Sequence, residues 1–166
     1  MSATKIDSLL FKSIMDDLHP EKEMSKMIGA IAFEKIGILS EKYFNINFCQ
    51  LIINSIESEF EVRKVALIFD VMVWSTPDNG KKLDFLTKNW VGSEDLIKIK
   101  SMIFRYEWLP INLDWKKLSR QIIKQDNRLA DLVKYYEEEL NYWNTTGLRR
   151  TELLKEKINL YSKFSK

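Results

Sequence analysis

Residues 113–143, LDWKKLSRQIIKQDNRLADLVKYYEEELNYW, decide the fold class of this chain. Apolar side chains recur there every seven residues, and further apolar side chains lie between them, as on one face of a helix. The pattern predicts one long amphipathic helix, with the repeating side chains on its core face. The residues of this series are Trp115, Ile122, Leu129, Tyr136 and Trp143.

The rest of the chain also favours helices. Only 5 Gly and 3 Pro interrupt its 166 residues, too few for the turns of a many-stranded sheet. Residues that commonly start helices precede several apolar stretches. They are Thr4, Pro20, Asn47 with Gln50, Ser58 with Glu61, Thr76-Pro77-Asp78 and Ser93-Glu94-Asp95.

These signals predict the remaining helices and their order. We expect helices over 4–18, 20–44, 48–57 and 59–74, one after Asp78, one from Asp95 to about Trp108, and a last one over 148–164. With the long helix, the prediction is an all-α, single-domain bundle of about eight helices over residues 1–166.

Residues 65–74 leave one alternative open and contain one unusual charge. They are rich in β-branched and aromatic residues and could form a strand, although the charged residues before them favour a helix. Asp70 lies among apolar neighbours, so its carboxylate has to be paired, exposed or shifted in pKa. Arg63 and Arg105 are the candidate partners. We expect a structural ion pair rather than a functional acid.

The sequence lacks the parts of the common enzyme mechanisms. His19 is the only histidine, and Gly80-Lys81-Lys82 lacks the remaining residues of a phosphate-binding loop. The acidic residues around His19 resemble a solvated turn more than a metal site. We therefore expect no catalytic residues, no cofactor site and no metal site.

Composition indicates an ordinary soluble protein. The chain is 45% hydrophobic and 30% charged, with a formal net charge of +2. Residues 65–74 are too short to cross a bilayer, and the first residues lack the apolar run of a secretory signal. Cys49 is the single cysteine and allows no internal disulfide. We expect a cytoplasmic protein that does not insert into a membrane.

Two acidic clusters are the candidate partner-binding residues. One lies at the joint between two predicted helices, and the other lies on the long helix. Each could form a broad negative surface that attracts a basic partner, although a merely solvated face would have the same composition. The clusters are Glu57, Glu59 and Glu61, and Glu137, Glu138 and Glu139.

Residues 148–166 have the opposite charge. Their basic side chains outnumber the acidic ones and could attract nucleic acid, although basic residues late in a helix also complement its dipole. The basic residues are Arg149, Arg150, Lys155, Lys157, Lys163 and Lys166, against Glu152 and Glu156.

The leading functional prediction is a non-enzymatic helical module that binds another protein. Its most specific form is a bacterial immunity or antitoxin-like inhibitor, whose acidic surface covers the basic active site of a nuclease toxin. The alternatives are a nucleic-acid-binding regulator that uses the basic C-terminal helix, and an enzyme with an unfamiliar carboxylate site that includes Asp70. The oligomeric state stays open.

Overall fold

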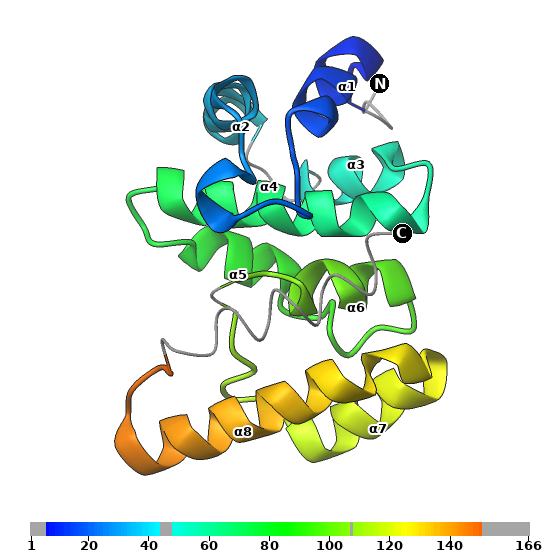
Figure 1. Cartoon of the computed structure of the whole chain (residues 1–166), viewed down its shortest axis with the longest axis vertical. Coiled ribbons are helices and arrows are strands. Elements are labelled where there is room, and N and C mark those ends of the chain that lie inside the picture. The colour runs from blue at the N-terminus through cyan, green and yellow to red at the C-terminus, as the bar shows by residue number, and fades with distance from the viewer. Residues whose placement is uncertain (1–5, 44–47, 107, 151–166) are drawn as a thin grey trace.

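The computed structural model describes residues 6–43, 48–106 and 108–150. These residues form eight α-helices and no strand, apart from an isolated bridge between Leu18 and Ile28 (Figure 1). The prediction of an all-α fold with about eight helices is confirmed. The helices are α1 (Ser8–Asp16), α2 (Ala30–Tyr43), α3 (Phe48–Ser55), α4 (Val62–Ser75), α5 (Lys81–Thr87), α6 (Leu96–Ile103), α7 (Trp115–Gln125) and α8 (Ala130–Thr146).

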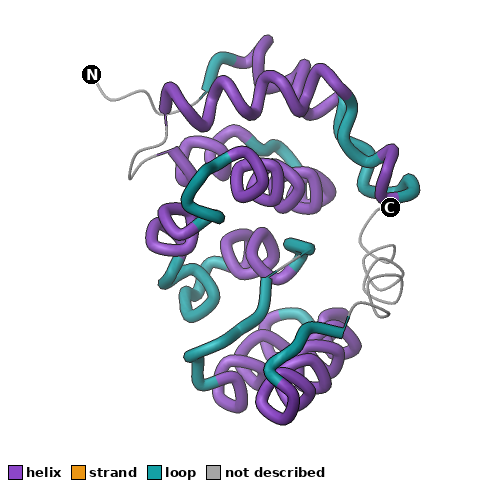
Figure 2. The backbone as a smooth tube through the Cα atoms, turned by 90° about the vertical axis from the view of Figure 1, so that its left-hand side faces the viewer, coloured by secondary structure: helices purple, strands orange, loops and turns teal. Residues whose placement is uncertain are grey.

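The helices stack in order along the longest axis of the molecule. α1 and α2 pack together at one end, α4 and α6 lie in the middle, and α7 and α8 pair at the other end (Figures 1 and 2). α4 contacts both α2 and α6 and is buried along most of its length. Residues 65–74 therefore form a central helix that is apolar on almost every side, which explains why their composition resembled that of a strand.

Several predicted helix starts are confirmed by hydrogen bonds. The Asp95 carboxylate accepts from the N–H groups of Ile97 and Lys98 before α6. The Glu61 carboxylate accepts from the N–H of Ser58, as the capping box requires. A short 3₁₀ helix, η2 (Glu59–Glu61), leads from this box into α4.

The prediction of one long helix over 113–143 is wrong. The helix is interrupted at Asp126, whose backbone is extended with φ −150° and ψ 102°. The chain then continues through η3 (Asn127–Leu129) into α8. The side chain of Asp126 accepts a hydrogen bond from the N–H of Arg128 and caps the new start. Because the chain turns back here, the apolar faces of α7 and α8 bury each other, and Leu129 is fully buried.

Two other boundaries differ because aspartates start the helices elsewhere. Asp7 caps α1 in the part of the chain that is described, while Thr4 lies outside it. α2 begins at Ala30 rather than near Pro20, because residues 20–29 form a turn that contains η1 (Met24–Lys26). Asp17 caps α2 by accepting from the N–H of Ala32 at 2.8 Å.

The last two boundaries lie near Pro110 and Gly147. α6 ends at Ile103, several residues before the predicted end at Trp108. Gly147 ends α8 in a left-handed conformation with φ 68°, as glycine readily does. Of the helix predicted over 148–164, residues 148–150 are not helical, and 151–166 lie outside the described residues.

A hydrophobic core runs through the described chain from Phe11 to Tyr136. The seven-residue series contributes to it as predicted, since four of its members are buried and Trp143 is partly buried. The periodicity therefore identified the correct faces, although the helix that carries them is not continuous.

Candidate functional site

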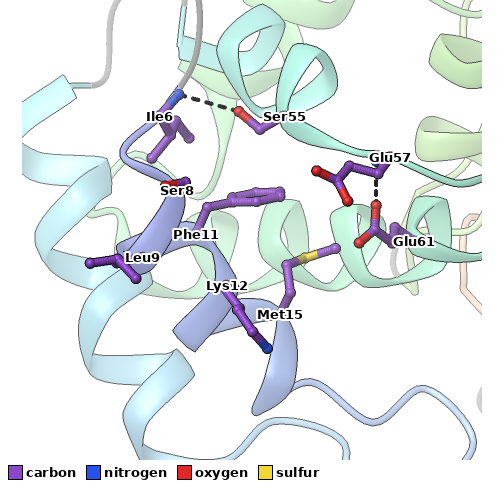
Figure 3. Close-up of a pocket in the computed structure, with 9 residues that line it drawn as sticks. All are labelled: Ile6, Ser8, Leu9, Phe11, Lys12, Met15, Ser55, Glu57 and Glu61. Atoms are coloured by element: carbon purple, nitrogen blue, oxygen red, sulfur yellow. Dashed lines mark hydrogen bonds between the residues drawn. The ribbon is translucent and has the colours of Figure 1, made fainter.

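A pocket of about 410 Å³ opens between α1 and the joint that leads from α3 to η2 (Figure 3). It contains two of the predicted partner-binding residues, Glu57 and Glu61. Its lining residues are Ile6, Ser8, Leu9, Phe11, Lys12, Met15, Ser55, Glu57 and Glu61.

The first helix supplies the apolar side of the pocket. Phe11 and Met15 are mostly buried and lie one turn apart on the inner face of α1. Leu9 is 78% exposed, although it lines the same pocket. The Ile6 N–H donates to Ser55 Oγ at 3.2 Å and holds the segment before α1 against α3. The sequence analysis did not include this apolar side, because its position depends on how α1 packs.

The joint supplies the acidic side of the pocket. The side chains of Glu57 and Glu61 reach from the joint toward Phe11 and Met15 (Figure 3). Glu61 accepts hydrogen bonds from the N–H groups of Glu57 and Ser58, which fixes its carboxylate. Glu57 is exposed at the mouth.

Among the described residues that line this pocket, Lys12 is the one cation, and its charge is paired with Asp16. Its Nζ lies 2.6 Å from a carboxylate oxygen of Asp16, one turn further along α1. The hydrogen bond from Lys12 lowers the pKa of Asp16. Lys12 is thus engaged by an acid outside the lining, and Glu57 and Glu61 are the acids of the described lining.

Glu59 lies in the same predicted cluster but has a different role. Its carboxylate pairs with Lys100 on α6 and, at 2.8 Å, with Arg128 beside α8. Lys100 is 1% exposed and also lies 2.8 Å from Asp126, the residue that breaks the predicted long helix. The hydrogen bond from Lys100 lowers the pKa of Glu59. This group, which we call the Lys100 network, connects η2, α6 and the turn between α7 and α8.

The acidic cluster on α8 is also divided. Glu137 and Glu138 are exposed, whereas Glu139 is 1% exposed and pairs with Arg149 at 3.2 Å and Arg150 at 2.9 Å. Glu137 lines a second pocket of about 440 Å³, between residues 110–116 and α8. The three consecutive glutamates therefore face different surroundings, as the spread of neighbouring residues around a helix requires.

The arginines that pair with Glu139 belong to the basic tail that the sequence analysis singled out. Arg150 also lies 3.8 Å from Glu138, and both arginines are only partly exposed. Their charges are thus engaged by acids of the same chain. The lysines of the tail lie outside the described residues.

Asp70 has the tertiary partner that the sequence suggested. Its carboxylate is 1% exposed, accepts from the Tyr106 N–H at 3.0 Å and lies 3.8 Å from Nε of Arg105. Arg63, the other candidate, donates to the carbonyl oxygen of Pro20 at 2.9 Å. The predicted ion pair of Asp70 is present, with Arg105 as a partner. That this pair is structural rather than part of a functional acid stays a prediction.

Two further kinds of reactive group are the cysteine and the metal-ligating side chains. Cys49 is buried, and burial raises the pKa of its thiol to about 12, which disfavours the nucleophilic thiolate. No group of three or more metal-ligating side chains comes together among the residues that the structure describes. Within the same residues, no helix has the length and apolarity that a bilayer crossing needs.

Comparison with known proteins adds no relative to this description. No protein-family model, curated protein or solved structure matches the chain.

Proposed function

We propose that this chain is a non-enzymatic module that binds another protein. The observation that carries the proposal is the pocket beside α1, where an apolar surface lies directly next to the acidic residues Glu57 and Glu61. Contact surfaces between proteins commonly combine an apolar centre with a polar rim. The exposed Leu9 at this pocket would lose its contact with water when a partner binds.

The more specific proposal is an immunity or antitoxin-like inhibitor of a basic toxin such as a nuclease. Acidic residues on the inhibitor would steer the encounter with a basic active site and then cover it. Glu57, Glu61, Glu137 and Glu138 support this form of the proposal, because their side chains are at least partly exposed. Glu59 and Glu139 contribute less to it, since each already pairs with cations of its own chain.

The test compares charge-neutralising variants of equal size. The purified chain is used to capture its partner from cells that contain it, and binding rates are then measured by surface plasmon resonance. The variants are Glu57→Gln with Glu61→Gln, and Glu137→Gln with Glu138→Gln. Glu34→Gln with Glu41→Gln is the matched control, because both residues are exposed on α2 and line neither described pocket.

We expect the first pair to slow association and the control to leave it unchanged. Exposed charges act mainly on the association rate, and each contributes about 0.2 to 1 kcal/mol. If only Glu137→Gln with Glu138→Gln slows association, the contact surface lies on α8 and not at the pocket beside α1. A captured nuclease whose activity falls when this chain is added would support the inhibitor form.

The same experiment has outcomes that contradict the proposal. If no protein is captured, the chain is not a protein-binding module under those conditions. If the chain instead binds DNA or RNA with a steep dependence on salt, it acts on nucleic acid. Neither charge variant should change the thermal unfolding temperature much, since Gln keeps the hydrogen-bond acceptor that Glu61 supplies to the capping box.

A further inference from the structure

We infer that the pocket beside α1 binds a peptide segment that presents a large aliphatic side chain next to an arginine or lysine. The inference rests on the proposed protein-binding function and names what the partner brings to this site. Three features of the pocket lead to it: its size and apolar wall, its two acids, and the exposed leucine at its edge.

The apolar wall accommodates an aliphatic side chain. Phe11 and Met15 provide aromatic and thioether surface on α1, and a methionine adapts its shape to different neighbours. The volume of about 410 Å³ is in the range of sites that hold small ligands. Leu9 also lines the pocket, but its side chain points away from Glu57 and Glu61 (Figure 3), so an aliphatic side chain of a bound segment would cover it at the outer rim.

The charges of the pocket select a cation beside that side chain. Glu57 and Glu61 reach into the pocket from the joint, and Lys12 is paired with Asp16. Two acids and one paired lysine therefore line the described part of the pocket, and the carboxylate of Glu61 is held in place by two backbone N–H groups. An arginine or lysine would find two acids close to the apolar wall.

The same charges argue against a membrane surface as the occupant. Anionic lipid headgroups attract basic segments, so they would be repelled by these acids. A peptide segment with one apolar and one basic side chain satisfies both halves of the pocket.

Capped dipeptides test this selection directly. The full chain, labelled with ¹⁵N, is titrated with N-acetyl-Leu-Arg-amide, N-acetyl-Leu-Glu-amide and N-acetyl-Gly-Arg-amide while backbone chemical shifts are followed. We expect saturable shifts at Ile6, Leu9, Met15, Ser55 and Glu57 with the Leu-Arg probe, and weaker binding of the other two. Replacing Glu57 and Glu61 with Gln should raise the dissociation constant of the Leu-Arg probe about two- to fivefold.

Two controls separate the pocket from a general charge effect. Glu34→Gln with Glu41→Gln removes the same charge from α2 and should leave the dissociation constant unchanged. Leu9→Gln changes an exposed side chain that is not part of the core. It should weaken binding of the Leu-Arg probe and leave binding of the Gly-Arg probe unchanged. Thermal unfolding of each variant confirms that it is folded.

Equal affinity for the Leu-Arg and Leu-Glu probes would overturn the selection for a cation. The inference also fails if the chemical-shift changes map to another surface or do not occur. These results are distinguishable from a failure of the proposed function. A captured partner that responds only to the α8 variants would overturn this inference and leave protein binding intact. Selective binding of the Leu-Arg probe without any captured protein would support the pocket's selectivity and contradict the proposed function.

Discussion

Gly29 and Asp17 show how closely single residues determine a helix start in this fold. The Asp17 carboxylate caps α2 by accepting from the N–H of Ala32, which follows it by 15 residues. A Cβ atom at position 29 would lie 2.1 Å from Asp17 Oδ1. Glycine is therefore favoured at position 29, because a side chain there would displace the capping carboxylate.

We predict that Gly29→Ala and Asp17→Ala are not additive. Gly29→Ala should destabilise the protein by about 1 to 3 kcal/mol because it overpacks the site. Asp17→Ala should cost about 0.5 to 2 kcal/mol through loss of the cap. The double variant should be more stable than the sum of the two costs predicts, because without the carboxylate the new methyl group has room. Urea denaturation measures all three.

Gly37→Ala is the matched control for this experiment. It also adds a methyl group to α2, but a Cβ at position 37 meets no atom within 4 Å. Alanine in the middle of a helix should stabilise it by about 0.5 to 1 kcal/mol relative to glycine. Strict additivity of the Gly29 and Asp17 changes would show that their atoms do not compete for space.

The turn between α7 and α8 is held by charges from elements distant in sequence. Asp126 receives hydrogen bonds from Arg128 beside it and lies 2.8 Å from Lys100 on α6. Since Lys100 is buried, the turn places an acid where this cation needs one. The break at Asp126 therefore serves the packing of α6 as well as the reversal of the chain.

We predict that the stabilisation by Asp126 depends on pH. Hydrogen bonds from Arg128 hold the pKa of Asp126 far below its ordinary value near 3.8. The carboxylate therefore stabilises the fold fully above that value and loses this effect as the pH falls through its lower, folded pKa. Asp126→Asn should destabilise the protein at neutral pH, and the difference from the unmodified chain should shrink below about pH 4.

Chemical denaturation at a series of pH values measures this difference. A gap between Asp126→Asn and the unmodified chain that stays constant from neutral to acidic pH would show that the charge of Asp126 contributes nothing. A gap that widens in acid would contradict the sign of the argument.

The helices differ in how much of them the sequence could predict. Local signals were sufficient at Asp95 and at the Ser58–Glu61 box, because cap and helix are adjacent in the chain. The break at Asp126 was not predictable in this way, since the apolar period continues across it and the stabilising cation comes from α6. In the candidate site, Glu57 and Glu61 were identified as a cluster, whereas Phe11 reaches them only through tertiary packing.

At the scale of the whole molecule, the predicted acidic surface divides into internal and external charges. Glu59 connects η2 with α6 and with Arg128, whereas Glu139 connects α8 with the residues that follow it. Glu57 and Glu137 line separate pockets, one beside α1 and one beside α8. Because the glutamates of each cluster are close in sequence, all six were predicted to act alike as partner-binding residues. In the structure they make different contacts, because successive residues of a helix or joint face different neighbours.

We predict that the chain needs Arg149 and Arg150 for full stability. A chain that ends at Gly147 leaves the buried Glu139 without either arginine and should be less stable than a chain that ends at Arg150, by about 3 to 5 kcal/mol. Glu139→Gln should recover part of that loss in the shorter chain, because it removes the buried charge. Equal stability of the two chains, measured by thermal unfolding, would contradict the role of this pair.

The pairing of Glu139 with Arg149 and Arg150 also affects when α8 can dock during synthesis of the chain. Glu139 leaves the ribosome before Arg149 and Arg150, so α8 would have to bury an uncompensated acid if it docked as soon as it emerged. Docking of α8 therefore becomes more favourable once about ten further residues have been added. During synthesis, the layers formed by α1 to α6 have time to assemble before the last layer closes onto them.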